Sequence, residues 1–312
     1  MRDPAMPTIE ILDDLFFIER GYLNCNHFVY RSPAPVLIDS GYVGDFAETE
    51  QHIRQTGVKL ADVAQIIGTH THCDHIGGNH RIQQQSGCDI ALHKIGKHFI
   101  DTRDDWATTW KYYDHRAEFF RCTQSLEDGD TIQVGPHSFR VIYTPGHAAD
   151  GIVLYHAEQK MLIASDTLWG KDMSVMTLRL EGSTALFQRL DALRRIEKLD
   201  VEAVYPGHGK PFGDFRAAVA KTRERIERFL IDRKWVGDDV LRKLLIFLLL
   251  MKKKIGEKEL FPYLMSTHWF KETVDFYFDG DYEIKYQDMM RSFLTKGIVK
   301  QNDDGFYTII KP

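Results

Sequence analysis

The feature that most constrains the fold is the stretch 68–78, Gly-Thr-His-Thr-His-Cys-Asp-His-Ile-Gly-Gly, which follows an apolar run of strand length at 63–67. Four side chains that can bind a metal lie within six consecutive positions: His70, His72, Asp74 and His75. At the end of an extended strand, side chains two residues apart share a face, so His70 and His72 can converge on one ion. A turn would then direct Asp74 and His75 to a second ion. These ligands are imidazole and carboxylate groups, and the site does not require a thiolate. Such a set suits zinc or another first-row divalent metal. A cluster of this density predicts a metal site and disfavours a chance group of surface histidines.

Strand-like and helix-like segments alternate around this motif. Helices are predicted at 45–57, 79–85 and 182–199. Strands are predicted at 9–12, 15–18, 27–30, 36–38, 63–67, 89–92, 131–134, 138–143, 152–155, 161–164 and 203–205. The alternation indicates an α/β layer architecture.

The motif Thr-His-Thr-His-Cys-Asp-His-Ile-Gly-Gly at 69–78 resembles the signature of the metallo-β-lactamase superfamily. The resemblance implies an αββα sandwich over residues 1–214. It also implies that His147, on the Pro-Gly turn that ends the strand at 138–143, completes the first metal site with His70 and His72. Asp39, at the end of the strand at 36–38, either supports a ligand histidine or only forms a turn.

Two later strand ends carry the remaining ligands that the resemblance implies. Asp166 follows the strand at 161–164 and would bridge two ions, whereas His208, in Pro-Gly-His-Gly at 206–209, would join Asp74 and His75. The cofactors would be two divalent ions, zinc first, with iron or manganese as alternatives. The nucleophile would be a metal-bridging hydroxide. Asp74, mainly a ligand, could also orient this hydroxide or carry a proton. We expect the other nine histidines, His115 among them, to be surface or packing residues.

The segment 94–122 interrupts the alternation of strands and helices. Residues 99–120 have a helical pattern rich in aromatic side chains. Such a helix could cover the metals, form a dimer contact, or pack on the protein's own core, and the last reading is slightly favoured. Tyr112 and Tyr113 are candidates for substrate binding.

The composition indicates the number of domains and the cellular compartment of the protein. The chain has 312 residues, 43% of them hydrophobic, which is enough for one large or two modest domains. Its net charge is −5. Residues 1–7 contain no apolar leader, and the apolar run at 244–251 is too short for a bilayer of about 30 Å. The four cysteines have no paired spacing. These features predict a cytoplasmic protein with free thiols and no membrane contact.

Residues 215–312 form the second predicted domain, which is helical and resembles a winged helix. Helices are predicted at 215–234, 240–254, 257–265 and 284–296, followed by a hairpin with an Asn-Asp-Asp-Gly turn. One branch of the superfamily, the lactamase-like endoribonucleases, carries a small C-terminal winged-helix module, and a resemblance to that branch would favour a nucleic-acid substrate. However, residues 286–296 offer little basic surface and acidic residues precede them, so a structural role, as a dimer contact or a pocket wall, is preferred.

The resemblance implies a metal-dependent hydrolase acting on a small-molecule acyl substrate, an ester, a thioester or a lactone. Asp166 favours the glyoxalase II, lactonase and nuclease branches over the true β-lactamases, although no clear counterpart of the glutathione-binding basic cluster of glyoxalase II is visible in the C-terminal part. An endoribonuclease or phosphodiesterase and an iron-dependent persulfide dioxygenase remain alternatives, because a shared fold does not select a substrate. A winged-helix binding protein with a relic site is the most remote reading.

Overall fold

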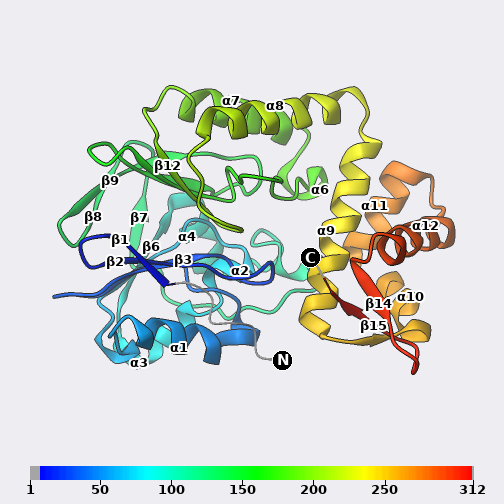
Figure 1. Ribbon diagram of the computed structural model, residues 1–312, viewed down its shortest axis with the longest axis horizontal. Helices are drawn as coiled ribbons and strands as arrows, with labels where there is room; N and C mark the ends of the chain where they lie inside the picture. The colour runs from blue at the N-terminus through cyan, green and yellow to red at the C-terminus, as the bar shows by residue number, and fades with distance from the viewer. Residues whose placement is uncertain (1–7, 311–312) are drawn as a thin grey trace.

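Two β-sheets pack face to face at the centre of this computed structural model, which describes residues 8–310 (Figure 1). The first sheet has the order β1-β2-β3-β4-β5-β6-β7. Its strands are Thr8–Leu12, Leu15–Ile18, His27–Tyr30, Val36–Ile38, Gln65–Ile67, Asp89–His93 and Gln124–Leu126. The second sheet has the order β12-β11-β10-β9-β8. Its strands, from β8 to β12, are Thr131–Val134, His137–Tyr143, Ile152–His156, Met161–Ser165 and Ala203–Pro206.

Helices cover the outer face of each sheet, which confirms the predicted αββα sandwich (Figure 1). On the first sheet lie α1 Phe46–Gln55, α2 Cys73–Ile76, α3 Asn79–Ser86 and α4 Lys94–Asp101, with single 3₁₀ turns at Val43–Asp45 and Leu60–Asp62. On the second lie α6 Leu178–Glu181, α7 Ala185–Ile196 and α8 Phe215–Ile231. The short helix α5 Trp110–Tyr113 contributes to the hydrophobic clusters on both sides of the sandwich.

Alternation along the strands produces these layers. In β3, Phe28 packs between the two sheets whereas Val29 packs under the helices. In β10, Leu154 packs between the sheets whereas Val153 packs under α7 and α8. Successive side chains of a strand point to opposite faces, so strands with apolar residues at every position are buried on both sides.

The C-terminal region is helical, as predicted. It contains α9 Lys234–Lys252, α10 Glu257–Ser266, α11 His268–Phe278 and α12 Tyr282–Thr295. A small sheet of order β13-β15-β14 closes it, with strands Ile255–Gly256, Phe306–Ile309 and Val299–Gln301. Leu241 and Leu245 of α9 belong to the same hydrophobic cluster as Leu162 of the second sheet. One core therefore continues across residue 214.

The single helix predicted over 99–120 is wrong. Helix α4 ends at Asp101 and α5 covers only Trp110–Tyr113. The Asp104 side chain accepts hydrogen bonds from the backbone of Trp106 and Ala107, while Thr109 and Asp114 adopt positive φ angles of 70° and 57°. Short polar side chains that bond to nearby backbone compete with helix formation in this way.

None of the helices within 8–310 combines the length and the apolarity needed to cross a membrane. Residues 1–7, on which the expectation of a missing leader rests, lie outside the described part of the chain.

Candidate metal centre

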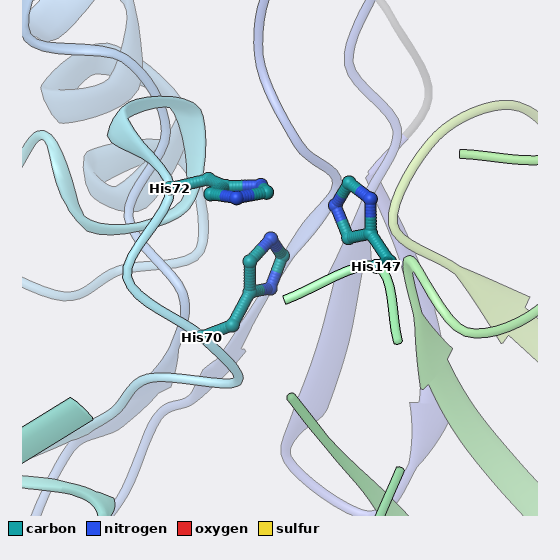
Figure 2. Close-up of side chains that lie close together, drawn as sticks. All are labelled: His70, His72 and His147. Atoms are coloured by element: carbon teal, nitrogen blue, oxygen red, sulfur yellow. The ribbon is translucent and has the colours of Figure 1, made fainter. Parts of the chain in front are cut away.

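Three histidines from two strand ends point toward one another (Figure 2). His70 and His72 follow β5, and His147 follows β9. One ring nitrogen of each lies within 4.8 Å of the others. The Nδ1 of His147 lies 2.7 Å from the carbonyl oxygen of Val175, which can only accept, so Nδ1 is the donor and Nε2 is the ring nitrogen that faces the cluster.

The unpaired Nε2 atoms of four buried histidines are the main evidence for a metal. Within residues 8–310, the buried Nε2 atoms of His70, His72, His75 and His147 have no hydrogen-bond partner. Leaving a buried polar atom unpaired costs about 1–3 kcal/mol. Four such atoms left unpaired would be costly, whereas bound cations would satisfy them. The donor set therefore fits a metal ion.

A second group lies beside the first. One ligand atom each from Asp74, His75 and His208 lies within 4.8 Å of the others, with His208 Nε2 3.1 Å from Asp74 Oδ2. Asp166, at the end of β11, has Oδ2 3.2 Å from His147 Nε2 and Oδ1 3.5 Å from His75 Nε2. One carboxylate therefore faces both groups, so the structure brings all seven predicted ligands together.

The backbone at Gly207 passes very close to two side chains of this site, Asp166 and His75. A Cβ atom on Gly207 would lie 2.1 Å from Asp166 Oδ1 and 3.2 Å from the His75 ring. Glycine at 207 is therefore what allows the loop that carries His208 to approach Asp166.

Asp39 holds the motif loop in place. Its Oδ1 accepts a hydrogen bond from the Thr69 backbone amide at 2.8 Å, and its Oδ2 lies 2.8 Å from both Thr69 Oγ1 and His75 Nδ1. These contacts fix the ring of His75 with Nε2 toward the site and support the partner role over a simple turn.

We expect Asp39→Asn to weaken metal binding by about 10- to 100-fold, because the amide cannot hold the His75 tautomer as a carboxylate does. Competition with a chelator of known affinity measures the change. Asp62→Asn, at an exposed position, is the control. Equal metal affinity in the two variants would contradict the role of Asp39.

The protonation states suit metal binding. Burial, together with neighbouring imidazoles, holds the pKa of His70 and His72 well below the usual range, which keeps both rings neutral. Although burial favours the neutral acid, His75 and His208 lower the pKa of Asp74 to about 2. Burial likewise opposes charge on His208, but Asp166 and Asp74 raise its pKa. The carboxylates therefore create a field that favours a cation.

A small cavity of about 60 Å³ opens onto these ligands. Its other walls are Tyr22, Tyr113, His115, Trp169, Val175, Lys243, Leu244 and Phe247. The ring of Tyr113 lines the cavity, while its hydroxyl lies 2.6 Å from Thr177 Oγ1. Tyr112 instead lines a separate cavity beside Val240 and Phe276, so it lies away from the metal ligands.

Sequence reasoning missed most of this lining. His115, expected to be a surface or packing residue, contributes to the cavity. Trp169 follows Asp166 by three residues and donates its indole N–H to Asp166 Oδ1 at 3.1 Å, so an aromatic residue just after a ligand was an available signal. Leu244 and Phe247 lie in an apolar run whose pattern is that of ordinary core.

Three relatives match from 47% to 77% of this chain. A probable metallo-hydrolase, YqjP of Bacillus subtilis, is 25% identical over 77% of this chain and 84% of its own length. A hydroxyacylglutathione hydrolase of Rhodospirillum rubrum is 29% identical over 47% of this chain and about half, 48%, of its own length. The acyl-coenzyme A thioesterase MBLAC2 of Bos taurus is 25% identical over 64% of this chain and 80% of its own.

Solved structures agree on the fold. The metallo-beta-lactamase family protein TTHA1429 of Thermus thermophilus superposes with a TM-score of 0.61 at 19% identity, covering 96% of this chain and 100% of its own. The match therefore includes the C-terminal helices as well as the sandwich. A sequence model of the metallo-beta-lactamase superfamily matches residues 23–208, more than half of the chain. With its histidines and aspartates positioned to bind metal, this chain belongs to the metallo-beta-lactamase superfamily of metal-dependent hydrolases.

Proposed function

We propose that this protein hydrolyses acyl thioesters or related esters with two divalent metal ions, zinc being the first candidate. The observation that carries the proposal is the convergence of seven ligand side chains, five of which line one cavity whose remaining walls are largely apolar and aromatic. His70, His72 and His147 would hold one ion. Asp74, His75 and His208 would hold the other, with Asp166 between them.

The ions, when bound, lower the pKa of a coordinated water toward 7 and polarise the acyl oxygen. The chain's own residues position the reactants. Asp74, ionised and 3.1 Å from His208, can accept or carry a proton at its Oδ2. Tyr113, Val175 and Phe247 exclude bulk water from one side of the cavity and offer an apolar surface to the acyl group.

Two relatives support this substrate class over phosphodiesters. The hydroxyacylglutathione hydrolase and the acyl-coenzyme A thioesterase carry names that describe thioester cleavage.

The C-terminal region, taken as a winged-helix-like domain from residue 215, would act as a pocket wall. Lys243, Leu244 and Phe247 of α9 line the cavity. The shared core on both sides of residue 214 supports a fixed wall over a separate nucleic-acid-binding module.

The experiment is turnover by the metal-loaded protein on acyl thioesters, lactones, phosphodiesters, single-stranded RNA and a glutathione persulfide. We expect cleavage of thioesters or esters that a chelator abolishes. Cleavage of RNA or phosphodiesters alone would contradict the proposal, as would oxygen consumption with the persulfide alone.

A further inference from the structure

A larger cavity adjoins the metal centre. It measures about 640 Å³, and Tyr22, Trp169 and His208 line both it and the small cavity over the ligands. The remaining walls come from the loop after Trp169, the loop after β12, the start of α8 and the face of α9. We call this larger cavity the outer groove. Only a small group fits beside the ligands, so any bulky part of a substrate must lie outside them.

The outer groove is positively charged. Lys171, Lys210, Lys221 and Arg242 line it. Lys221 Nζ donates to the carbonyl oxygen of Lys171 at 2.8 Å. Within residues 8–310, the ion pairs include none with Lys171, Lys210 or Lys221, all of which are exposed.

Two carboxylates also line the groove, but they do not neutralise all of its positive charge. Asp172 already pairs with Arg225 and with Arg242, the latter at 3.2 Å. Asp214 is exposed at the start of α8. Three lysines therefore remain available to an anion from outside the chain.

The rings around the ligands show which end of a substrate would reach the groove. On one side, Tyr113 lies 6.3 Å from His72, and His115 and Phe247 continue the row with centroids 4.5 Å apart. On the other side, Trp169 lies 5.1 Å from His208. The first side is lined by these rings and by Leu244 and Phe247 of α9, whereas the second adjoins the outer groove with its lysines.

We propose that the outer groove binds the phosphate groups of a carrier thiol, so that the substrate is the acyl thioester of a phosphate-bearing carrier. This proposal rests on the proposed function. The acyl group lies against Tyr113 and Phe247, and the carrier runs past Trp169 and Tyr22 to the lysines. Phosphates are strong acceptors for lysine ammonium groups, and the aromatic Phe212 and Trp169 supply surface for the rest of the carrier.

The reaction balances with water alone. The oxygen of one water forms a bond to the acyl carbon, and the bond between that carbon and sulfur breaks. The sulfur leaves with one proton of the water as the free thiol, and the acyl group leaves as a carboxylate with release of the other proton. The groove contributes binding of the leaving thiol.

The first test compares one acyl group on two thiols, coenzyme A and N-acetylcysteamine, which lacks phosphate. The variant is Lys210→Ala/Lys221→Ala, at two exposed positions outside the metal centre. We expect KM for the acyl-coenzyme A to rise about 10-fold, the scale of two exposed charge contacts, with kcat little changed. The N-acetylcysteamine thioester should be cleaved equally well by both proteins. The control Lys59→Ala/Lys198→Ala removes the same charge from exposed positions elsewhere.

The second test measures binding of free coenzyme A by calorimetry at two salt concentrations and does not depend on turnover. Binding that weakens in the groove variant but not in the control supports the groove, and added salt should weaken it further. Unchanged binding or unchanged KM in the groove variant overturns the proposal. Binding in the groove without cleavage of any thioester would instead refute the proposed function and leave the groove assignment standing.

Discussion

Replacing Asp166 with alanine will lower kcat/KM by about 10³-fold or more and deplete bound metal, because this carboxylate faces both ligand groups. Without it, two neighbouring cations would repel each other with no negative charge between them. The variant should stay folded, since the Asp166 carbonyl is held by Arg189 at 2.5 Å and Ser174 at 2.6 Å independently of the side chain. Elemental analysis measures the metal content, and a turnover assay on the same sample measures kcat/KM.

Asp200→Ala is the control for this variant, because it removes an exposed carboxylate that pairs with Lys160 at the surface. Metal content and turnover should match those of the parent protein there. An Asp166→Ala protein with unchanged metal content and turnover would refute the bridging role.

Replacing Asp239 with alanine will destabilise the fold by about 3–5 kcal/mol, the cost of removing one partner from a buried ion pair. Asp239 Oδ2 accepts from Lys243 Nζ at 2.6 Å, and both side chains are almost fully buried. Arg225 also lies 2.6 Å from this carboxylate. The variant leaves the Lys243 ammonium buried, with Asp172 at 3.7 Å as its nearest remaining acid. Denaturant unfolding of the metal-loaded protein measures the loss.

The adjacent residue provides a matched control for this prediction. Asp238 is exposed and pairs with Lys285 at the surface, so Asp238→Ala should cost about 1 kcal/mol or less. The double variant Asp239→Leu/Lys243→Met should recover most of the stability, since apolar residues can replace a buried pair. Equal losses in Asp238→Ala and Asp239→Ala would show that the buried network contributes little.

The sandwich could be predicted because its signals are local. The strands at 27–30 and 36–38 match β3 and β4, since runs of apolar residues between turn signals leave few alternatives. Helix α11 was missed because its sequence is rich in aromatic and β-branched residues with modest helix propensity. Burial of Trp269, Phe270 and Val274 stabilises it instead, and local sequence does not encode that packing.

The candidate site likewise has one part that could be predicted from the sequence and one part that could not. The ligand residues lie in short motifs at strand ends, where spacing and resemblance locate them. The cavity walls depend on how α9 packs against the sandwich. Nothing near Lys243 or Phe247 in the sequence indicates that these side chains face His72 and Asp74. The outer groove likewise combines lysines from a loop, a second loop and α8.

The most direct test of a two-metal acyl hydrolase is thioester turnover by metal-free protein as zinc is added back in known equivalents. Activity that rises to a plateau as two equivalents bind, and that Asp166→Ala lacks, is the predicted result. Full thioester turnover without added metal would contradict the account, and so would two bound equivalents with cleavage of phosphodiesters only.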